Sequence, residues 1–364
     1  MHARYATGQG IEDFMTASLA MFGAILAVVS GIMNGVFALP MRYLGRWDWE
    51  NVWLPYIVVA CLLLPAGIVC FTVAAPMAIF AASPVSAIVA ALVCGSLWGF
   101  GAIMFGQAVS AVGISLTNTI ALAISASLGS LLPMFILNPS SLSSKHGLMV
   151  LAGTAIAIVG MVVSGKAGTL REKNHRALNK VEAEGEGTLV GRRRPMRVGM
   201  ILCIGAGILS AVFNIGFSFA QPIIAAGIHA GHAASDGTNL VWLLLLGSGG
   251  IVNVIFCVYL LIKNGSARKF LLPGLGRLSV STLLMGLFWG GAIFVYGEAS
   301  TRLGSLGPAL GWPLFLTTGL LVSNVCGVFT GEWKSTAVNT KWWMGWGLVL
   351  LAAAILVLGE AGTM

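Results

Sequence analysis

The sequence predicts an all-α polytopic membrane protein with ten transmembrane helices arranged as two inverted five-helix repeats. Three observations support this fold class. Hydrophobic residues make up 57% of the chain and charged residues only 9%, which leaves too much apolar surface for a soluble core. Ten apolar runs are each long enough to cross a bilayer. Motifs from the first half of the chain also recur in the second half.

The ten membrane helices can be placed from hydropathy, because a helix that crosses the hydrocarbon core needs about 20 mostly apolar residues. The chain contains 48 glycines, which fit close helix packing in a membrane. The predicted helices occupy residues 17–40, 52–74, 85–108, 113–137, 147–165, 198–221, 239–262, 278–299, 306–329 and 342–360.

A polar stretch at residues 166–197 separates a first five-helix repeat, at 17–165, from a second, at 198–360. We interpret it as a basic cytoplasmic linker, with a lipid-headgroup or regulatory patch as the alternative. The loops after the odd-numbered spans hold 17 of the 20 Lys and Arg residues. The positive-inside rule then places both termini outside, in the periplasm, for a chain in the bacterial inner membrane.

An internal repeat is indicated by two motifs that recur with the same spacing. The matching segments are Leu97-Trp98-Gly99, Phe105-Gly106-Gln107-Ala108 and Gly113, against Phe288-Trp289-Gly290, Tyr296-Gly297-Glu298-Ala299 and Gly304; residues 31–37 also match residues 207–213. Because each repeat has an odd number of spans, the second copy should enter the membrane in the opposite direction. Such a pair of halves can rock about a site at the bilayer midplane, unless the match is a chance similarity of glycine-rich helices.

Polar side chains inside the predicted spans mark a central pathway, because a polar group facing lipid is costly. Ser210, Asn214, Ser218 and Gln221 lie on one face of the sixth span. The first, fourth and ninth spans also carry polar residues, including Asn34 and Asn118, whereas the second, fifth and tenth carry few. We therefore expect spans one, four, six and nine to line the pathway, with spans two, five and ten outside it. The alternative is that these groups only join helices through hydrogen bonds.

Aromatic residues in the third and eighth spans suggest a sugar as the substrate. Trp98 with Phe105, and Trp289 with Tyr296, are each separated by seven residues, so each pair shares a helix face. The C–H faces of a sugar stack on aromatic rings, while its hydroxyls need partners such as Asn, Gln and Tyr. The alternative is that these rings serve only in packing.

Glu298 is the acidic residue well within a predicted span, which makes it a candidate proton carrier. The simpler interpretation is an ion pair with Arg302, one helical turn away. His229, His232 and Asp236 lie in the loop after the sixth span, but their spacing does not predict a metal site. Arg42, at the inner end of the first span, is interpreted as a topology anchor.

The chain resembles a known transporter family at several motifs. These are the segment from Gly31 to Pro40, Arg46-Trp47-Asp48-Trp49-Glu50, Leu97-Trp98-Gly99-Phe100-Gly101 with Gly106 and Gly113, and Gly331-Glu332-Trp333. They are similar to the L-rhamnose/proton symporter family of the drug/metabolite transporter superfamily, over residues 17–360. The resemblance implies ten spans in two inverted repeats and proton-driven import of a deoxy-hexose. It also implies polar residues after the tryptophans of spans three and eight, where this chain has Ala102, Met104 and Ala292.

The predicted function is proton-coupled import of L-rhamnose or a related sugar by alternating access. The residues expected to bind the substrate are Asn34, Trp98, Asn118, Asn214, Gln221, Trp289 and Tyr296, with Glu298 coupling the proton. The expected partners are the sugar, a proton and membrane lipid, with no cofactor, metal ion or nucleic acid. Efflux of amphipathic metabolites is the alternative, a membrane transferase or a channel is less favoured, and the oligomeric state is left open.

Overall fold

The structure is a computed structural model that describes residues 2–40, 47–183, 195–271, 275–334 and 336–363. All regular elements in these ranges are helical, which confirms the all-α prediction. Ten helical segments are long and apolar enough to cross a membrane, as predicted. The membrane helices of the first half are α1 (His2–Val36), α2 (Trp49–Ile57) continued by η2 (Val58–Leu63) and α3 (Leu64–Thr72), α5 (Val85–Val112), α6 (Ile114–Leu137) and α7 (Lys145–Ala183).

The membrane helices of the second half are α8 (Met196–Phe219), continued by α9 (Gln221–His229), α10 (Ala234–Asn264), α11 (Leu275–Arg302), α12 (Gly307–Phe329) and α13 (Val338–Gly362). Short elements join them: α4 (Pro76–Ala82), η3 (Pro139–Ser143), η4 (Ser266–Leu271) and η5 (Gly304–Leu306). The fifth membrane helix runs to Ala183, so residues 166–183 of the expected linker continue α7 as helix.

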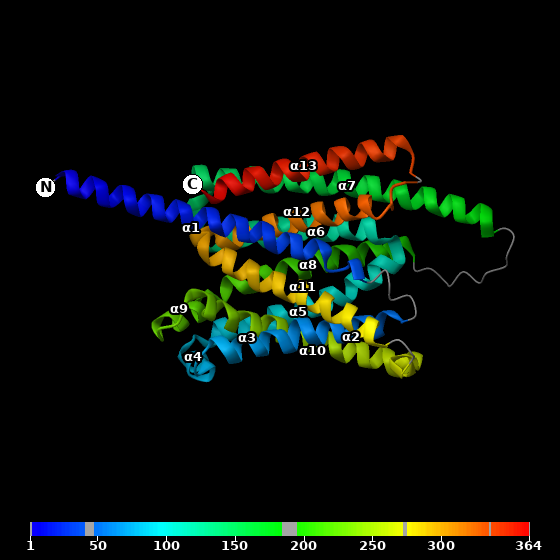
Figure 1. Ribbon diagram of the computed structural model, residues 1–364, viewed down its shortest axis with the longest axis horizontal. Helices are drawn as coiled ribbons and strands as arrows, with labels where there is room; N and C mark the ends of the chain where they lie inside the picture. The colour runs from blue at the N-terminus through cyan, green and yellow to red at the C-terminus, as the bar shows by residue number, and fades with distance from the viewer. Residues whose placement is uncertain (1, 41–46, 184–194, 272–274, 335, 364) are drawn as a thin grey trace.

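The two ends of the helix bundle serve below as reference faces. We call the end where α1 begins and α13 ends the terminus face, and the opposite end, where α7 ends and α8 begins, the linker face (Figure 1). The ends of α1, α10 and α12 lie at the linker face, whereas the ends of α6 and α11 lie at the terminus face.

Helices of the two halves have matching neighbours. Helix α1 packs on α11 and α12, and its counterpart α8 packs on α5 and α6. Helix α7 runs along its own counterpart α13, and α2 with α3 runs along its counterpart α10. The main contacts are thus matched when each membrane helix is exchanged with the one five places later, whereas weaker ones, such as α1 with α13 and α7 with α12, have no counterpart of similar strength. The opposite orientation of the two halves remains a prediction.

Glycines at equivalent repeat positions allow two close helix crossings. A Cβ atom added to Gly31 of α1 would lie 2.5 Å from the Thr318 Cβ atom of α12. A Cβ atom added to Gly207 of α8 would lie 2.8 Å from the Ile124 Cβ atom of α6. Neither distance is possible for a real side chain, so only glycine permits these two contacts between the halves.

The second membrane helix is irregular where it approaches the centre of the bundle. Pro55 lies inside α2, and six residues of π-helix follow at Val58–Leu63. Proline removes one backbone hydrogen bond and a π-helical turn shifts the register of the side chains, and such turns are frequent at functional sites. The irregular segment packs closely on Gly286 and Gly290 of α11.

Candidate functional site

A central cavity of about 230 Å³ lies between the two halves. It is lined by side chains of α1, α2, α5, α6, α8, α11 and α12. Its polar and aromatic lining residues are Asn34, Phe37, Trp53, Tyr56, Trp98, Phe105, Asn118, Ser210, Phe213, Trp289, Trp312, Phe315 and Ser323. The cavity is therefore mostly aromatic, with a few amides and hydroxyls, as is typical of small-molecule sites.

Trp98 and Trp289 form one wall of this cavity. They occupy the same position in the two repeats, and their rings stack with centroids 5.3 Å apart at an interplanar angle of 9°. Trp98 also contacts Phe213 at 5.0 Å, and Trp289 meets Tyr56 edge-on at 6.0 Å. The structure thus brings together two residues that the sequence placed on separate helices, and the pair presents a continuous apolar surface to the cavity.

The polar groups of the cavity come mainly from α1, α6 and α8. Asn34 and Asn118 both line it, as does Ser210, which accepts a 3.0 Å hydrogen bond from the Ser125 hydroxyl. The amide nitrogen of Asn34 lies against Gly319 of α12, where a Cβ atom would come within 2.5 Å of it. Four of the predicted substrate residues, Asn34, Trp98, Asn118 and Trp289, therefore line a single cavity.

Asn214 and Tyr296 lie next to this cavity but do not line it. Both are fully buried. The Asn214 amide donates to the carbonyls of Gly129, at 2.8 Å, and Pro308, at 3.0 Å, and its oxygen accepts from the Tyr296 hydroxyl. Asn214 thereby ties α8 to α6, α12 and α11, so in this conformation its hydrogen bonds go to helices rather than to a ligand.

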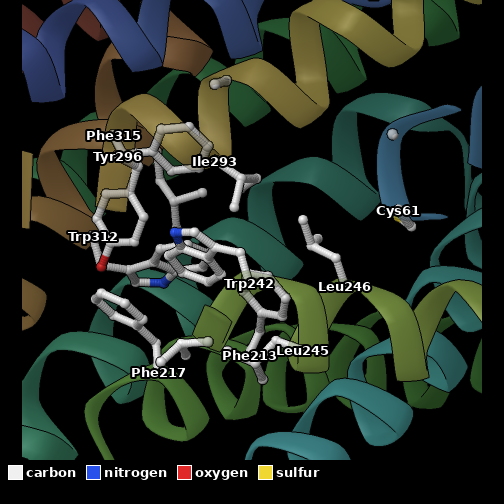
Figure 2. Packing of buried hydrophobic residues seen from close by; sticks show 14 of the residues in the cluster. Cys61, Phe213, Phe217, Trp242, Leu245, Leu246, Ile293, Tyr296, Trp312 and Phe315 are labelled. Atoms are coloured by element: carbon white, nitrogen blue, oxygen red, sulfur yellow. The ribbon is translucent and has the colours of Figure 1, made fainter. Parts of the chain in front are cut away.

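A cluster of aromatic rings fills the space around these two residues on the side of the terminus face. We call it the aromatic plug, and it consists of Phe213, Phe217, Trp242, Tyr296, Trp312 and Phe315 (Figure 2). Neighbouring ring centroids lie 4.4 to 6.1 Å apart. Aromatic contacts at such distances are tightly packed. The plug therefore closes the central cavity toward the terminus face.

Successive turns of α8 show the boundary between open and closed space. Ser210 lines the central cavity, and one turn later Asn214 is buried in the plug. Ser218 and Gln221 then line a separate groove of about 670 Å³ that also contains Pro308. The Gln221 amide donates to the Phe217 carbonyl at 3.4 Å, a long hydrogen bond. Gln221 is thus separated from the other predicted substrate residues by the plug.

Glu298 lies near the terminus face, outside the central cavity. Its carboxylate pairs with Arg302 on the same helix, and both side chains are 29% exposed. It borders a shallow cavity that contains Leu19 and His146. The simpler interpretation of Glu298, an ion pair one turn apart, therefore describes this conformation, and its role in proton coupling remains a prediction.

The other polar residues noted in the sequence have local roles or lie outside the described residues. His232 lies 3.9 Å from Asp236 on the next turn. No group of three metal-ligating side chains occurs among the described residues. Arg42 falls in the segment 41–46, which lies outside them.

A second cavity, of about 340 Å³, adjoins the central one toward the linker face. The two share Asn118, Leu320 and Ser323. Its lining also includes Asn324, whose buried amide nitrogen has no hydrogen-bond partner in the structure, and the charged pair Arg171 and Glu332. The central cavity therefore adjoins polar space on the linker side, while the plug closes it on the other side.

The prediction that spans two, five and ten lie outside the pathway is wrong. Trp53 and Tyr56 of α2 line the central cavity, and the linker-side cavity is lined by Ser164 and Arg171 of α7 and by Met344 of α13. Span two was set aside because it contains almost no polar side chain, yet its aromatic rings face the cavity. The three-residue spacing of Trp53 and Tyr56, which puts both on one helix face, is the signal that could have found them.

Comparison with known proteins gives one consistent family. A family model described as L-rhamnose-proton symport protein (RhaT) matches residues 15–362. The L-rhamnose-proton symporter of Mannheimia succiniciproducens is 25% identical over 350 residues, covering 94% of this chain and 98% of that protein. Proteins of the same name from Yersinia pestis and Shigella flexneri are 24% and 23% identical, covering 94% and 93% of this chain and 98% of each relative. These matches confirm the resemblance inferred from the sequence motifs.

Proposed function

The chain belongs to the L-rhamnose-proton symport protein family, and from this premise we propose that it imports L-rhamnose, or a closely related sugar, together with a proton. It is a multi-pass membrane protein of a transporter family. The observation that carries the proposal is a central cavity between the halves that is closed by the aromatic plug on one side and adjoins polar space on the other. A site that communicates with one face at a time is what alternating access requires.

The lining of the central cavity suits a deoxy-sugar. The Trp98–Trp289 wall offers an apolar surface for the C–H face and the methyl group of such a sugar. Asn34, Asn118 and Ser210 supply amide and hydroxyl groups, each able to donate and accept hydrogen bonds. The cavity volume is below the range of about 300–1,000 Å³ typical for drug-sized ligands. We therefore infer that these residues bind the sugar in this conformation.

The plug acts as the gate toward the terminus face. Opening it requires α8 to separate from α6 and α12, which breaks the two hydrogen bonds from the Asn214 amide. Ser218 and Gln221 would then border the same space as Ser210, because all three lie on one face of α8 and α9. In that state Gln221, Asn214 and Tyr296 become available to the arriving sugar. This assigns them to the opposite conformation rather than to the one described above.

Two inverted five-helix repeats, at residues 17–165 and 198–360 with a basic linker between them, supply the rocking motion. The exchangeable helix contacts and the paired Gly31 and Gly207 crossings support this arrangement. We place the protein in the bacterial inner membrane with both termini in the periplasm, because the basic loops lie at the linker face. The cavity then faces the cytoplasm, the side on which an importer releases its substrate.

Transport by purified protein in liposomes tests this function. Labelled L-rhamnose should accumulate above its external concentration when an inward proton gradient is imposed, and a protonophore should abolish the accumulation. Other monosaccharides at the same concentration serve as controls for specificity. Net export of amphipathic compounds with no response to any sugar would instead support the efflux alternative.

A further inference from the structure

A proton-coupled transporter needs a group that binds the proton within reach of the substrate pathway, and in membrane proteins such a group is usually a carboxylate or His side chain. The described lining of the central cavity contains no carboxylate. The linker-side cavity that adjoins it contains Glu332. The following inference rests on the function proposed above and concerns where the proton binds.

The chain positions Glu332 through the way α12 ends. Gly331 adopts a φ of +82°, and the backbone N–H groups of Glu332 and Gly331 donate to the carbonyls of Gly327, at 3.0 Å, and Val328, at 3.1 Å. These bonds form a Schellman motif, which folds the chain back over the last turn of the helix. The Glu332 carboxylate lies so close to Gly327 that an added Cβ atom would be 3.2 Å from it. The backbone therefore holds this carboxylate at the cavity edge.

The partner of Glu332 comes from the other half of the molecule. Arg171 of α7 forms an ion pair with it, and its guanidinium lies 4.9 Å from the centre of the Trp333 ring. The side chains are 17% exposed for Arg171 and 32% for Glu332, so water reaches the carboxylate from the cavity. The ion pair is therefore a contact between the first and second halves at the linker face.

Other charged groups around this pair come from the same two regions. Glu172, next to Arg171, accepts a 3.1 Å hydrogen bond from the Ser115 backbone at the start of α6. Lys334 lies beside Gly331, and Lys166 lies 3.5 Å from the Trp343 ring centre. Lys334 therefore adds a second positive charge near Glu332, besides that of Arg171.

We propose that Glu332 is the proton-binding carboxylate of the symporter and that Arg171 is its positioning residue. A proton from solution adds to one carboxylate oxygen and gives a neutral acid, while Arg171 keeps its charge, so the ion pair between the two side chains is lost. Protonation thus weakens a contact between the halves, which links proton binding to relative movement of the halves at the linker face. When the proton leaves toward the linker face, the ion pair forms again.

Glu298 differs from Glu332 in one decisive respect. Its partner Arg302 lies on the same helix, so protonation of Glu298 breaks no ion pair between the halves. Glu298 also lies on the far side of the plug from the linker-side cavity. Replacement of Glu332 by Gln and replacement of Glu298 by Gln are therefore expected to affect proton coupling differently.

The experiment compares Glu332→Gln with the wild-type protein in liposomes by three measurements. These are L-rhamnose accumulation under a proton gradient, proton uptake reported by a pH-sensitive dye when L-rhamnose is added, and exchange of labelled for unlabelled sugar without a gradient. Glu332→Gln should lose accumulation and sugar-dependent proton uptake and retain exchange, and its exchange rate should no longer vary with pH. Glu332→Asp should restore proton uptake.

Two further variants give the comparison its controls. Asp48→Asn removes another carboxylate that pairs with a cation at the linker face, Lys269 at 2.7 Å, but lines neither cavity, so coupling should be unchanged. Glu298→Gln should also remain coupled. Sugar-dependent proton uptake by Glu332→Gln, or loss of exchange in both Glu332 variants, overturns the proposal. A wild-type protein that takes up no protons with L-rhamnose refutes the proposed function itself, whatever the variants do.

Discussion

Equivalent positions of the two repeats carry different residues on the two sides of the central cavity. On the terminus side, Tyr296 is fully buried in the aromatic plug, and Trp312 belongs to the plug while one part of it lines the central cavity. The residues with the same spacing in the first repeat are Phe105 and Ala121, and both of these line open cavity. Phe37 and Phe213 also match between the repeats, and the residue that follows is Ala38 in the first half and Asn214 in the second.

This difference shows that the two gates are not chemical copies of one another. At the equivalent positions, the linker side lacks the hydroxyl of Tyr296, the indole of Trp312 and the amide of Asn214. When the linker side closes, it cannot reproduce the Asn214 network and must depend on other contacts. Two halves with related sequences therefore close the two sides of the cavity with different side chains.

The largest effect is expected from Asn214→Ala, which removes the centre of the closed gate. Interhelical hydrogen bonds in membrane proteins contribute about 0.6 kcal/mol each on average, so the loss of all three should lower the stability by about 2 kcal/mol. Thermal unfolding in detergent and sugar accumulation in liposomes measure the change, and both should fall. Ser218→Ala, one turn away on the same helix face, is the matched control, since its hydroxyl bonds only within α8. If Asn214→Ala transports and unfolds like the wild type, the plug is not the gate.

The Trp98–Trp289 wall is expected to produce the next largest effect, on affinity rather than on stability. Aromatic contacts contribute about 0.5–1.5 kcal/mol beyond the area they bury, so Trp289→Ala should weaken sugar binding roughly tenfold. Trp289→Phe should recover most of the loss. Binding is measured by the shift in melting temperature that L-rhamnose produces. If L-rhamnose shifted the melting temperature of Trp289→Ala as much as that of the wild type, the Trp98–Trp289 wall would not be part of the sugar site.

Tyr296→Phe isolates the single hydroxyl that distinguishes Tyr296 from its repeat partner Phe105. The ring stays in the plug, and one hydrogen bond to Asn214 is lost. At about 0.6 kcal/mol, this loss should increase the fraction of molecules open to the terminus face roughly threefold. The readout is the labelling rate of a cysteine placed at Ser218 in a background without accessible native cysteines. A labelling rate equal to that of the parent would show that the hydroxyl does not hold the gate.

Gln221→Ala should have the smallest and most directional effect. Because Gln221 lies beyond the plug, its amide should meet the sugar only from the terminus side. The loss of one hydrogen bond, about 0.5 kcal/mol at the low end of the usual range, should raise the KM for entry from that side roughly twofold. The KM for sugar that enters from the linker side should stay the same. Equal changes on both sides would place Gln221 in a shared site instead.

Hydropathy and spacing located the elements of the fold because a bilayer imposes the same length and polarity on every crossing helix. They also found Trp98 and Trp289, since the repeat identifies equivalent positions without any knowledge of contacts. The same approach missed Trp53 and Tyr56, because aromatic rings in an apolar span carry no polar signal. Arg171 and Glu332 were not considered as site residues, because both lie beyond the predicted ends of spans five and nine.

The sequence by itself located ten helices able to cross a membrane and the helix faces that carry polar groups, and it predicted that the two halves are related. Only the tertiary structure decided which of those groups face open space. Asn118 and Asn214 look alike in the sequence, as amides within apolar helices, yet one lines both cavities and the other is fully buried. The periodicity of the sequence gives the direction of a side chain around the axis of its own helix. The carbonyls that Asn214 binds belong to α6 and α12, so only the packing of these helices brings them to it.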